Sequence, residues 1–199
     1  MEEKHIEILN VNVYGIKEAL IRSGYPMATE VQDMENVNVD VPKLMKRGIR
    51  LGNSPYGHGD DKFLRQIMVS YDIIAPRYWW QQHDTYHWFT KNSMSSMHKT
   101  KSLDYRKLAN RYVSPRILEA FQEFVDEYIK NPTEENLLYL KSNMPEGICI
   151  GAGITTSYAQ LKTIWYQRHN HRLPEWREFC KWIRTLPWTK EFGVVEWCC

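Results

Sequence analysis

Two histidines and an aspartate stand at a spacing that metal sites use. His83 and His87 are four residues apart with Asp84 between them, which gives the pattern H-D-x-x-H. On a helix the two imidazoles would share one face, and the pattern is similar to the zinc-binding H-E-x-x-H with a shorter general base. The alternative is a pair of helical histidines bonded to neighbours or to water, which is the commoner case. We therefore predict no metal site.

Other catalytic motifs are missing from the sequence. There is no G-x-S-x-G turn, and no cysteine stands beside a histidine. The glycines of residues 147–153 are spaced neither as a Walker loop nor as a dinucleotide fingerprint. A close approach between elements accounts for these glycines better.

Aromatic and polar side chains crowd together in residues 78–89, 91–99 and 166–176. Trp, Tyr and His beside amide, hydroxyl and Arg donors can stack a planar ring and bond its edge. A nucleobase and a flavin both have this character. The alternative is an aromatic core, which we favour for Trp79, Trp165 and Trp182. A core does not readily explain the polar members of these segments, Gln82, Asn92, Ser95 and Arg168.

The elements that must position these residues can be read from periodicity. Strands are predicted over residues 6–13, where the alternation slips by one at Asn10, and over 66–74. Helices are predicted over 16–22, from 77 to about 89, from Pro115 behind an N-cap at Ser114, after 131–134, over 155–169 and from Pro174. The pattern is weak over 24–60, and turns or loops are expected at 90–100 and 147–153.

Composition bounds the fold and the partners. The chain has 199 residues, is 43% hydrophobic and 25% charged, and carries a formal net charge of +2. These values fit one globular α+β domain, residues 1–199, with a helical C-terminal half. A near-neutral balance argues against a nucleic-acid partner bound through its phosphates.

Location and redox state follow from the absence of certain signals. No apolar run approaches the roughly 20 residues that span a bilayer, and the N-terminus lacks a signal peptide, so we expect a cytoplasmic protein without a membrane partner. The cysteines, Cys149, Cys180, Cys198 and Cys199, show no C-x-x-C spacing, and the terminal pair is interpreted as an inert tail rather than a prenylation signal.

The order of the segments resembles that of the flavin-dependent thymidylate synthases. The sequence Ile74-Ala75-Pro76 is followed by Gln82 at the matching distance, and residues 85–98 align without a gap with R-H-R-x-x-S-x-N-E-x-S-x-R-Y. The helix up to Arg168 and the later Glu175-Trp176 keep the spacing with one extra residue. The resemblance runs from about His58 to Trp176.

This resemblance implies a fold, ligands and site residues. The fold is the thymidylate synthase-complementing-protein type, with a central, mostly antiparallel sheet, assembled as a homo-oligomer (tetramer or dimer). The ligands are FAD and a uracil nucleotide. The resemblance implies that Arg168 and Ser95 are catalytic, that Gln82 binds the substrate with them, and that the flavin is held by His58, His87, Thr90 and Asn92.

The chain departs from the family motif mainly by losing positive charge. Residues 85–87 (Thr-Tyr-His) replace R-H-R, Met97-His98 replaces Arg-Tyr, Ser93 replaces Glu, and Gly151 stands where an arginine for the nucleotide phosphate is expected. Four permanent cations are lost in total. Standard binding of the two ligands then requires a substitute among Arg77, Lys91, Lys99 and Arg172.

Two functions follow. The first is a thymidylate-synthase-like protein with a remodelled pocket, whose reaction would be reductive one-carbon transfer to C5 of a uracil nucleotide. The second is a catalytically inactive phage protein that uses this scaffold to bind and inhibit a host protein. The wording Y-W-W…D-T-Y…M-H-K over residues 78–99 is similar to uncharacterised phage and prophage proteins, which suggests a mobile-element origin.

Overall fold

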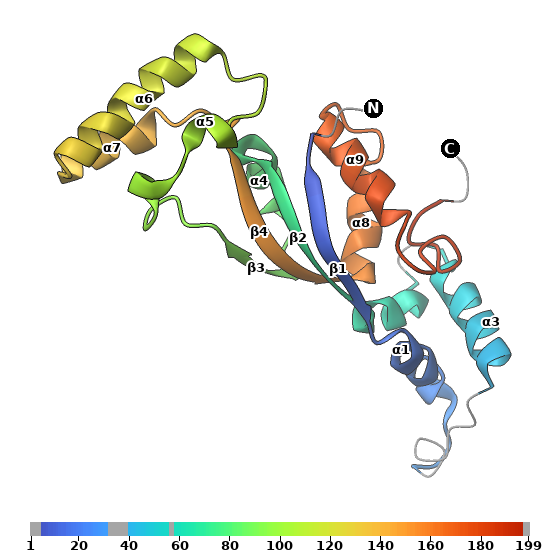
Figure 1. Ribbon diagram of the computed structural model, residues 1–199. Coiled ribbons are helices and arrows are strands. Elements are labelled where there is room, and N and C mark those ends of the chain that lie inside the picture. Colours follow the sequence, from blue (N-terminus) through green and yellow to red (C-terminus); the bar gives the residue numbers. More distant parts are fainter. Residues whose placement is uncertain (1–4, 32–39, 56–57, 197–199) are drawn as a thin grey trace. The chain divides into compact units, whose positions relative to one another are not determined.

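The computed structural model describes residues 5–31, 40–55 and 58–196. The sheet has four strands in the order β1-β2-β4-β3 and is antiparallel. Its strands are β1 (Glu7–Tyr14), β2 (Met68–Pro76), β3 (Phe89–Ser93) and β4 (Cys149–Ser157). Figure 1 labels the four strands. Chain contacts divide the protein into two compact units, and each strand has residues in both of them. Unit 1 comprises residues 1–8, 72–87 and 91–153, and unit 2 the rest.

Two strands match their predictions closely. β1 has the expected extent, and Asn10 adopts φ 52°, a left-handed conformation at the residue where the alternation slips. In β2 the residues Val69, Tyr71 and Ile73 are buried and their neighbours half-buried, as period-2 alternation requires. Pro76 is the last residue of the strand.

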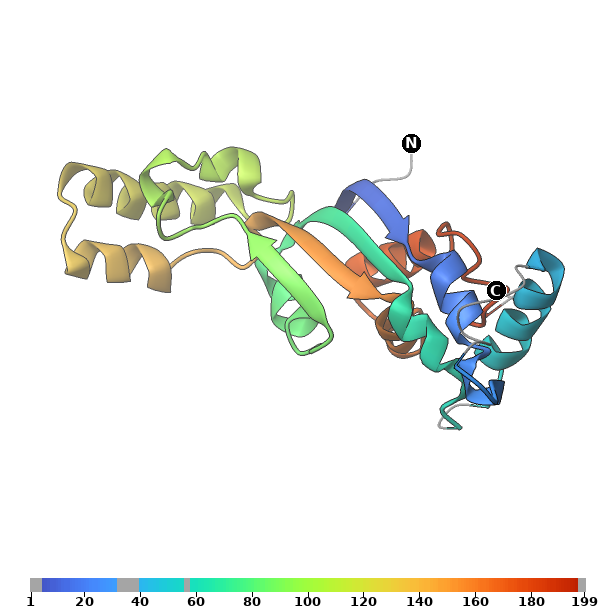
Figure 2. The same cartoon turned by 90° about the horizontal axis from the view of Figure 1, so that it is seen from below.

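The helices of unit 1 begin with α4 (Arg77–His83) and continue with α5 (Tyr105–Leu108), α6 (Pro115–Lys130) and α7 (Glu134–Ser142). Figures 1 and 2 both show α6 and α7 lying side by side. A buried cluster that includes Phe121, Val125 and Leu140 joins them. Ser114 takes the N-cap position of α6 but its side chain makes no capping hydrogen bond, whereas the Thr133 side chain caps α7.

Unit 2 holds α1 (Ile16–Arg22), α3 (Val41–Gly52), α8 (Tyr158–Arg168) and α9 (Pro174–Ile183), with short 3-10 turns over 25–27 and 60–66. The predicted stripe of α9 is confirmed, because Trp176, Phe179, Cys180 and Ile183 are all buried. Phe179 and Trp182 pack against Tyr71 at ring distances of 5.9 and 4.6 Å. No helix in the described part of the chain is long and apolar enough to cross a membrane.

Three predictions for the chain between these elements are wrong. Helix α3 was missed, because its buried stripe is Leu44, Gly48 and Gly52 and two glycines give no apolar signal. Residues 149–157 form β4 instead of a turn and a helix start, with Ala152, Ile154 and Thr156 buried. The helix from Arg77 ends at residue 83, and residues 89–93 form a strand instead of a loop.

Candidate functional site

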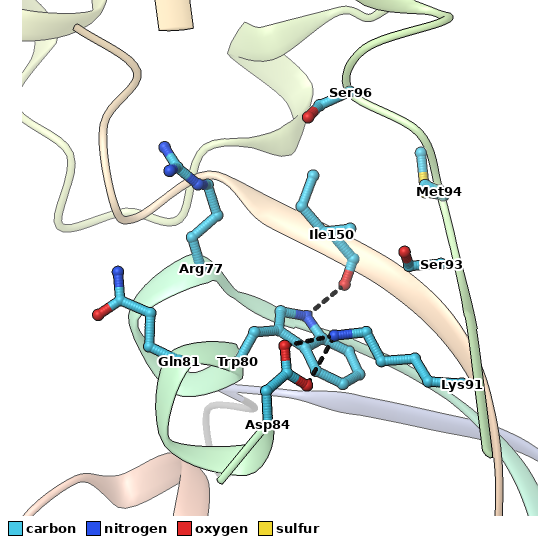
Figure 3. A pocket seen from close by; sticks show the side chains of 9 residues that line it. All are labelled: Arg77, Trp80, Gln81, Asp84, Lys91, Ser93, Met94, Ser96 and Ile150. Atoms are coloured by element: carbon cyan, nitrogen blue, oxygen red, sulfur yellow. Dashed lines mark hydrogen bonds and ion pairs between the residues drawn. The ribbon is translucent and has the colours of Figure 1, made fainter. Parts of the chain in front are cut away.

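A cavity of about 270 Å³ lies in unit 1 (Figure 3). Six of its nine lining residues are polar or charged. They come from α4 and the turn after it, from β3 and the loop after it, and from β4: Arg77, Trp80, Gln81, Asp84, Lys91, Ser93, Met94, Ser96 and Ile150. Figure 3 shows Ser93 and Ser96 on one side of the cavity and Arg77 on the other, with Ile150 between them.

Local structure explains why these residues share a wall. Arg77, Trp80, Gln81 and Asp84 stand at i, i+3, i+4 and i+7, which is one face of a helix. The α4 helix gives way to a turn in which the Thr85 hydroxyl donates to the carbonyl oxygen of residue 82 at 2.7 Å. On the opposite side, Lys91 and Ser93 are two residues apart on β3 and therefore project from the same side of the strand.

The Trp80 ring, which lines the cavity, is covered by the Lys91 ammonium. The indole N–H of Trp80 donates to the carbonyl of Ile150 at 2.9 Å, which fixes the ring. The Lys91 ammonium lies 4.3 Å from the centre of that ring and 2.7 Å from both carboxylate oxygens of Asp84. Trp80 is accordingly only 6% exposed. A planar ligand ring has no free indole face to stack on here.

Two further cations meet at the other end. The Arg77 guanidinium donates to the Met144 carbonyl at 2.9 Å and lies 3.4 Å from a carboxylate oxygen of Glu146. The ammonium of Lys141, on α7, donates to the Ser96 carbonyl. Burial lowers the pKa of Lys141, and the charge of Arg77 lowers it further. Arg77, which lines the cavity, and Lys141, which bonds a lining residue, are therefore two half-buried positive charges that act on each other.

His83, the last residue of α4, belongs to a cluster of aromatic rings. Its ring stacks on Trp79 at 4.8 Å and meets the edges of Trp80 and Tyr86. Burial lowers its pKa to about 4, against a weaker opposing effect of Asp84, so the imidazole is neutral at pH 7. Because α4 ends at this residue, His83 and His87 do not share a helix face. Among the described residues no group of three or more metal-ligating side chains comes together.

Four of the predicted site residues lie in unit 1, and none of them lines the cavity. Gln82 is half-buried next to the lining residue Gln81, and Asn92 is exposed between Lys91 and Ser93. The Ser95 hydroxyl accepts from the backbone N–H of His98 at 3.0 Å and pairs with Nδ1 of the same residue at 2.9 Å. His87 is exposed.

The other three predicted site residues lie in unit 2. His58 and Thr90 are exposed, and their side chains make no hydrogen bond to a described residue. Arg168, the last residue of α8, is half-buried, and its guanidinium carbon lies 4.9 Å from the centre of the Trp176 ring. The expectation that Trp79 and Trp165 are core residues is confirmed at 0% and 2% exposure, whereas Trp182 is half-buried.

Of the four residues expected to replace the lost arginines of the family motif, two line the cavity and two do not. Arg77 and Lys91 line the cavity, whereas Lys99 in unit 1 and Arg172 in unit 2 are exposed. A side chain at Gly151 would place its Cβ 3.2 Å from the sulfur of Met94. The space beside residue 151 is therefore occupied by a thioether, which suits the loss of an arginine there.

Sequence reasoning missed Gln81, Ser96 and Lys141. The family motif directed attention to the neighbouring residues 82 and 95, although the i, i+3, i+4, i+7 spacing from Arg77 marks Gln81 and Asp84 as partners of Trp80. Lys141 had no signal, because α7 is joined to the cavity only by tertiary packing.

A second cavity, of about 410 Å³, lies in unit 2 beside α8. Lys162 lines it and is 6% exposed. Its ammonium is engaged at 2.9 Å by both Asp61 and the Gly52 carbonyl. The Lys162 ammonium is thus neutralised by the Asp61 carboxylate. The unit 1 cavity is therefore the better candidate for a charged ligand.

Comparison with solved structures identifies the architecture. No protein-family model and no curated protein sequence matches the chain significantly. A thymidylate synthase X from Helicobacter pylori with FAD and dUMP superposes with a TM-score of 0.74 at 14% identity, over 94% of this chain and 97% of that one. The fold is that of the flavin-dependent thymidylate synthases. The predicted α+β class with an antiparallel sheet is thereby confirmed.

Two further solved structures match the fold of this chain. Another complex of the H. pylori enzyme with FAD and dUMP gives a TM-score of 0.68 at 14% identity, over 94% and 97% of the two chains. The UMP/dUMP methylase PolB from Streptomyces cacaoi, bound with 5-Br dUMP, gives 0.65 at 12% identity, over 95% and 93%. None of the three is described as a host-binding inhibitor, so the alternative function gains no support from them.

Proposed function

We propose that this protein binds a uracil nucleotide and a flavin and transfers a one-carbon unit to C5 of the uracil. The observation that carries the proposal is the thymidylate-synthase fold, shared over more than nine-tenths of the chain with three structures, of two proteins, that hold a uracil nucleotide or its analogue. The charged cavity of unit 1 supports it, because a nucleotide brings an anionic group that needs cations.

The uracil ring needs a donor for its carbonyl edge, and Arg168 is our choice. Its guanidinium is half-buried on Trp176, so its orientation is restrained and its charge is less screened than at an exposed site. In this role it stabilises the negative charge that develops on the ring oxygen when C5 becomes nucleophilic. Ser95 and Gln82 orient the ring through hydroxyl and amide hydrogen bonds.

The residues proposed to hold the flavin fit its ring rather than its diphosphate. Two imidazoles, a hydroxyl and an amide are hydrogen-bonding groups suited to the carbonyl and N–H edge of isoalloxazine. The side chains of these residues, His58, His87, Thr90 and Asn92, make no hydrogen bond to a described residue. A bound flavin would supply hydride for reduction of the transferred carbon. None of the four carries a permanent charge, so we expect weaker FAD binding than an arginine-rich site provides.

The test is release of tritium from dUMP labelled at C5, assayed with FAD, a reductant and a methylene folate. We expect release by the purified protein and a loss of roughly 10²-fold in Arg168→Gln, because one charge-stabilising donor is removed. Arg50→Gln is the matched control, since Arg50 is an exposed arginine of the same unit with no proposed role in ligand binding. Absence of tritium release from the folded wild-type protein would contradict the proposed reaction.

Homo-oligomeric assembly, a phage origin and a cytoplasmic location stay predictions. A thymidine auxotroph that expresses the protein provides a cellular test of the same reaction. Growth without thymidine is the expected result.

A further inference from the structure

The inference concerns which residues of unit 1 receive an anionic group. It deepens the proposed function and rests on it only for the identity of the rest of the ligand. Three kinds of group that recognise a phosphate come together here: the Arg77 guanidinium and the hydroxyls of Ser93 and Ser96 line the cavity, and the Lys141 ammonium bonds the carbonyl of the lining residue Ser96. None of these residues is among those that the family motif designates.

The first observation is an ammonium without a carboxylate. In the described part of the chain Lys141 donates to one backbone carbonyl, that of Ser96, and forms no ion pair. By contrast, Lys91 is held by both oxygens of Asp84. Of these two lysines, Lys141 is therefore the one whose charge is left for a ligand.

The second observation is the second cation beside it. Arg77 is close enough for its charge to lower the pKa of Lys141, and burial of the lysine acts in the same direction. The carboxylate that pairs with Arg77 belongs to Glu146, whose side chain is 48% exposed and also accepts a hydrogen bond from the Gln81 amide at 2.9 Å. Two half-buried cations repel each other, and an anion between them removes the repulsion.

The third observation is the wall of hydroxyls. Ser93 and Ser96 line the cavity, and their hydroxyls make no hydrogen bond to a described residue. Figure 3 places both on the side opposite Arg77. These two hydroxyls can donate to anionic oxygens, while the covered Trp80 face offers nothing to a nucleobase.

We propose that Arg77, Lys141, Ser93 and Ser96 form a binding site for a phosphate group, the phosphomonoester of the nucleotide. The ligand's phosphate enters the end of the cavity away from Trp80, accepts from the guanidinium and the ammonium, and is completed by the two serine hydroxyls. The sugar and the base lie outside this subsite.

The test compares three probes by calorimetric titration of the full chain: dUMP, deoxyuridine and inorganic phosphate. We expect dUMP to bind at least tenfold more tightly than deoxyuridine, because the nucleoside has no phosphate. Lys141→Gln is expected to weaken dUMP and phosphate about tenfold and to leave deoxyuridine unchanged. Lys130→Gln, an exposed lysine on α6, is the matched control. Arg77→Lys keeps the charge, loses the bidentate geometry and is expected to weaken dUMP in the same direction.

The outcomes separate this inference from the proposed function. If dUMP binds equally to the wild type, Lys141→Gln and Arg77→Lys, the phosphate subsite is wrong while uracil-nucleotide binding stands. If inorganic phosphate binds and is weakened by Lys141→Gln but neither dUMP nor deoxyuridine binds, the subsite stands and the proposed function is wrong. Failure of all three probes to bind contradicts both.

Discussion

Arg77 and Gln81 share one face of α4 with Trp80, whereas Gln82 lies one residue further round the helix. The same offset recurs on β3, where Lys91 and Ser93 line the cavity and Asn92 lies between them. Neighbouring residues in a helix or a strand project in different directions, so the motif positions and the cavity-lining positions alternate along the same segments. The motif therefore identifies the segments that form the cavity, but not which of their side chains line it.

Acid sensitivity is a prediction at this scale. The pKa of His83 is lowered by burial from 6.5 to about 4, so the unfolded chain binds a proton more readily than the folded one between these values. Stability from the neutral imidazole is fully present above about pH 6.5 and is lost as the pH falls towards 4. The loss reaches on the order of 3 kcal/mol of unfolding free energy.

Urea unfolding between about pH 7 and about pH 5 measures this effect. His83→Phe keeps a ring against Trp79 and is expected to remove much of the pH dependence. The same substitution at exposed His87 controls for loss of an imidazole. Equal pH slopes in His83→Phe and the wild type would show that this histidine is not responsible.

Helices and strands were predicted where apolar side chains recur at a regular spacing, and two of the missed elements, α3 and β4, contain glycines that interrupt that spacing. The spacing of Trp176 and Phe179 predicted α9, and the alternation around Tyr71 predicted β2. Helix α3 places Gly48 and Gly52 on its buried side, and β4 contains two glycines beside Ala152. At these positions packing depends on the absence of a side chain, which periodicity of apolar residues does not record.

A prediction at the scale of elements concerns α7. Leu140 is 0% exposed in the cluster that joins α7 to α6, whereas Leu138 on the same helix is 58% exposed. Leu140→Ala is expected to cost about 2–5 kcal/mol of unfolding free energy through lost burial and a cavity. Leu138→Ala should change it by less than about 0.5 kcal/mol. Denaturant unfolding of both variants checks this, and similar losses would refute the assigned packing.

For the molecule as a whole, the fold was more predictable than the site. The order of segments indicated the thymidylate-synthase architecture, although sequence identity to the matching structures is only 12–14%. The net charge of +2 concealed a local concentration of cations, because Lys141, on a helix more than 40 residues beyond the motif, bonds the cavity-lining residue Ser96. Such a convergence depends on tertiary packing and leaves no trace in sequence spacing.

Retention of flavin by the protein decides whether it binds FAD and a uracil nucleotide as proposed. The full chain is incubated with FAD and dUMP and passed over a gel-filtration column while the visible absorbance is recorded. We expect the flavin bands to elute with the protein and dUMP to increase the retained fraction. A colourless protein peak, with all FAD in the small-molecule volume even when dUMP is present, would contradict it.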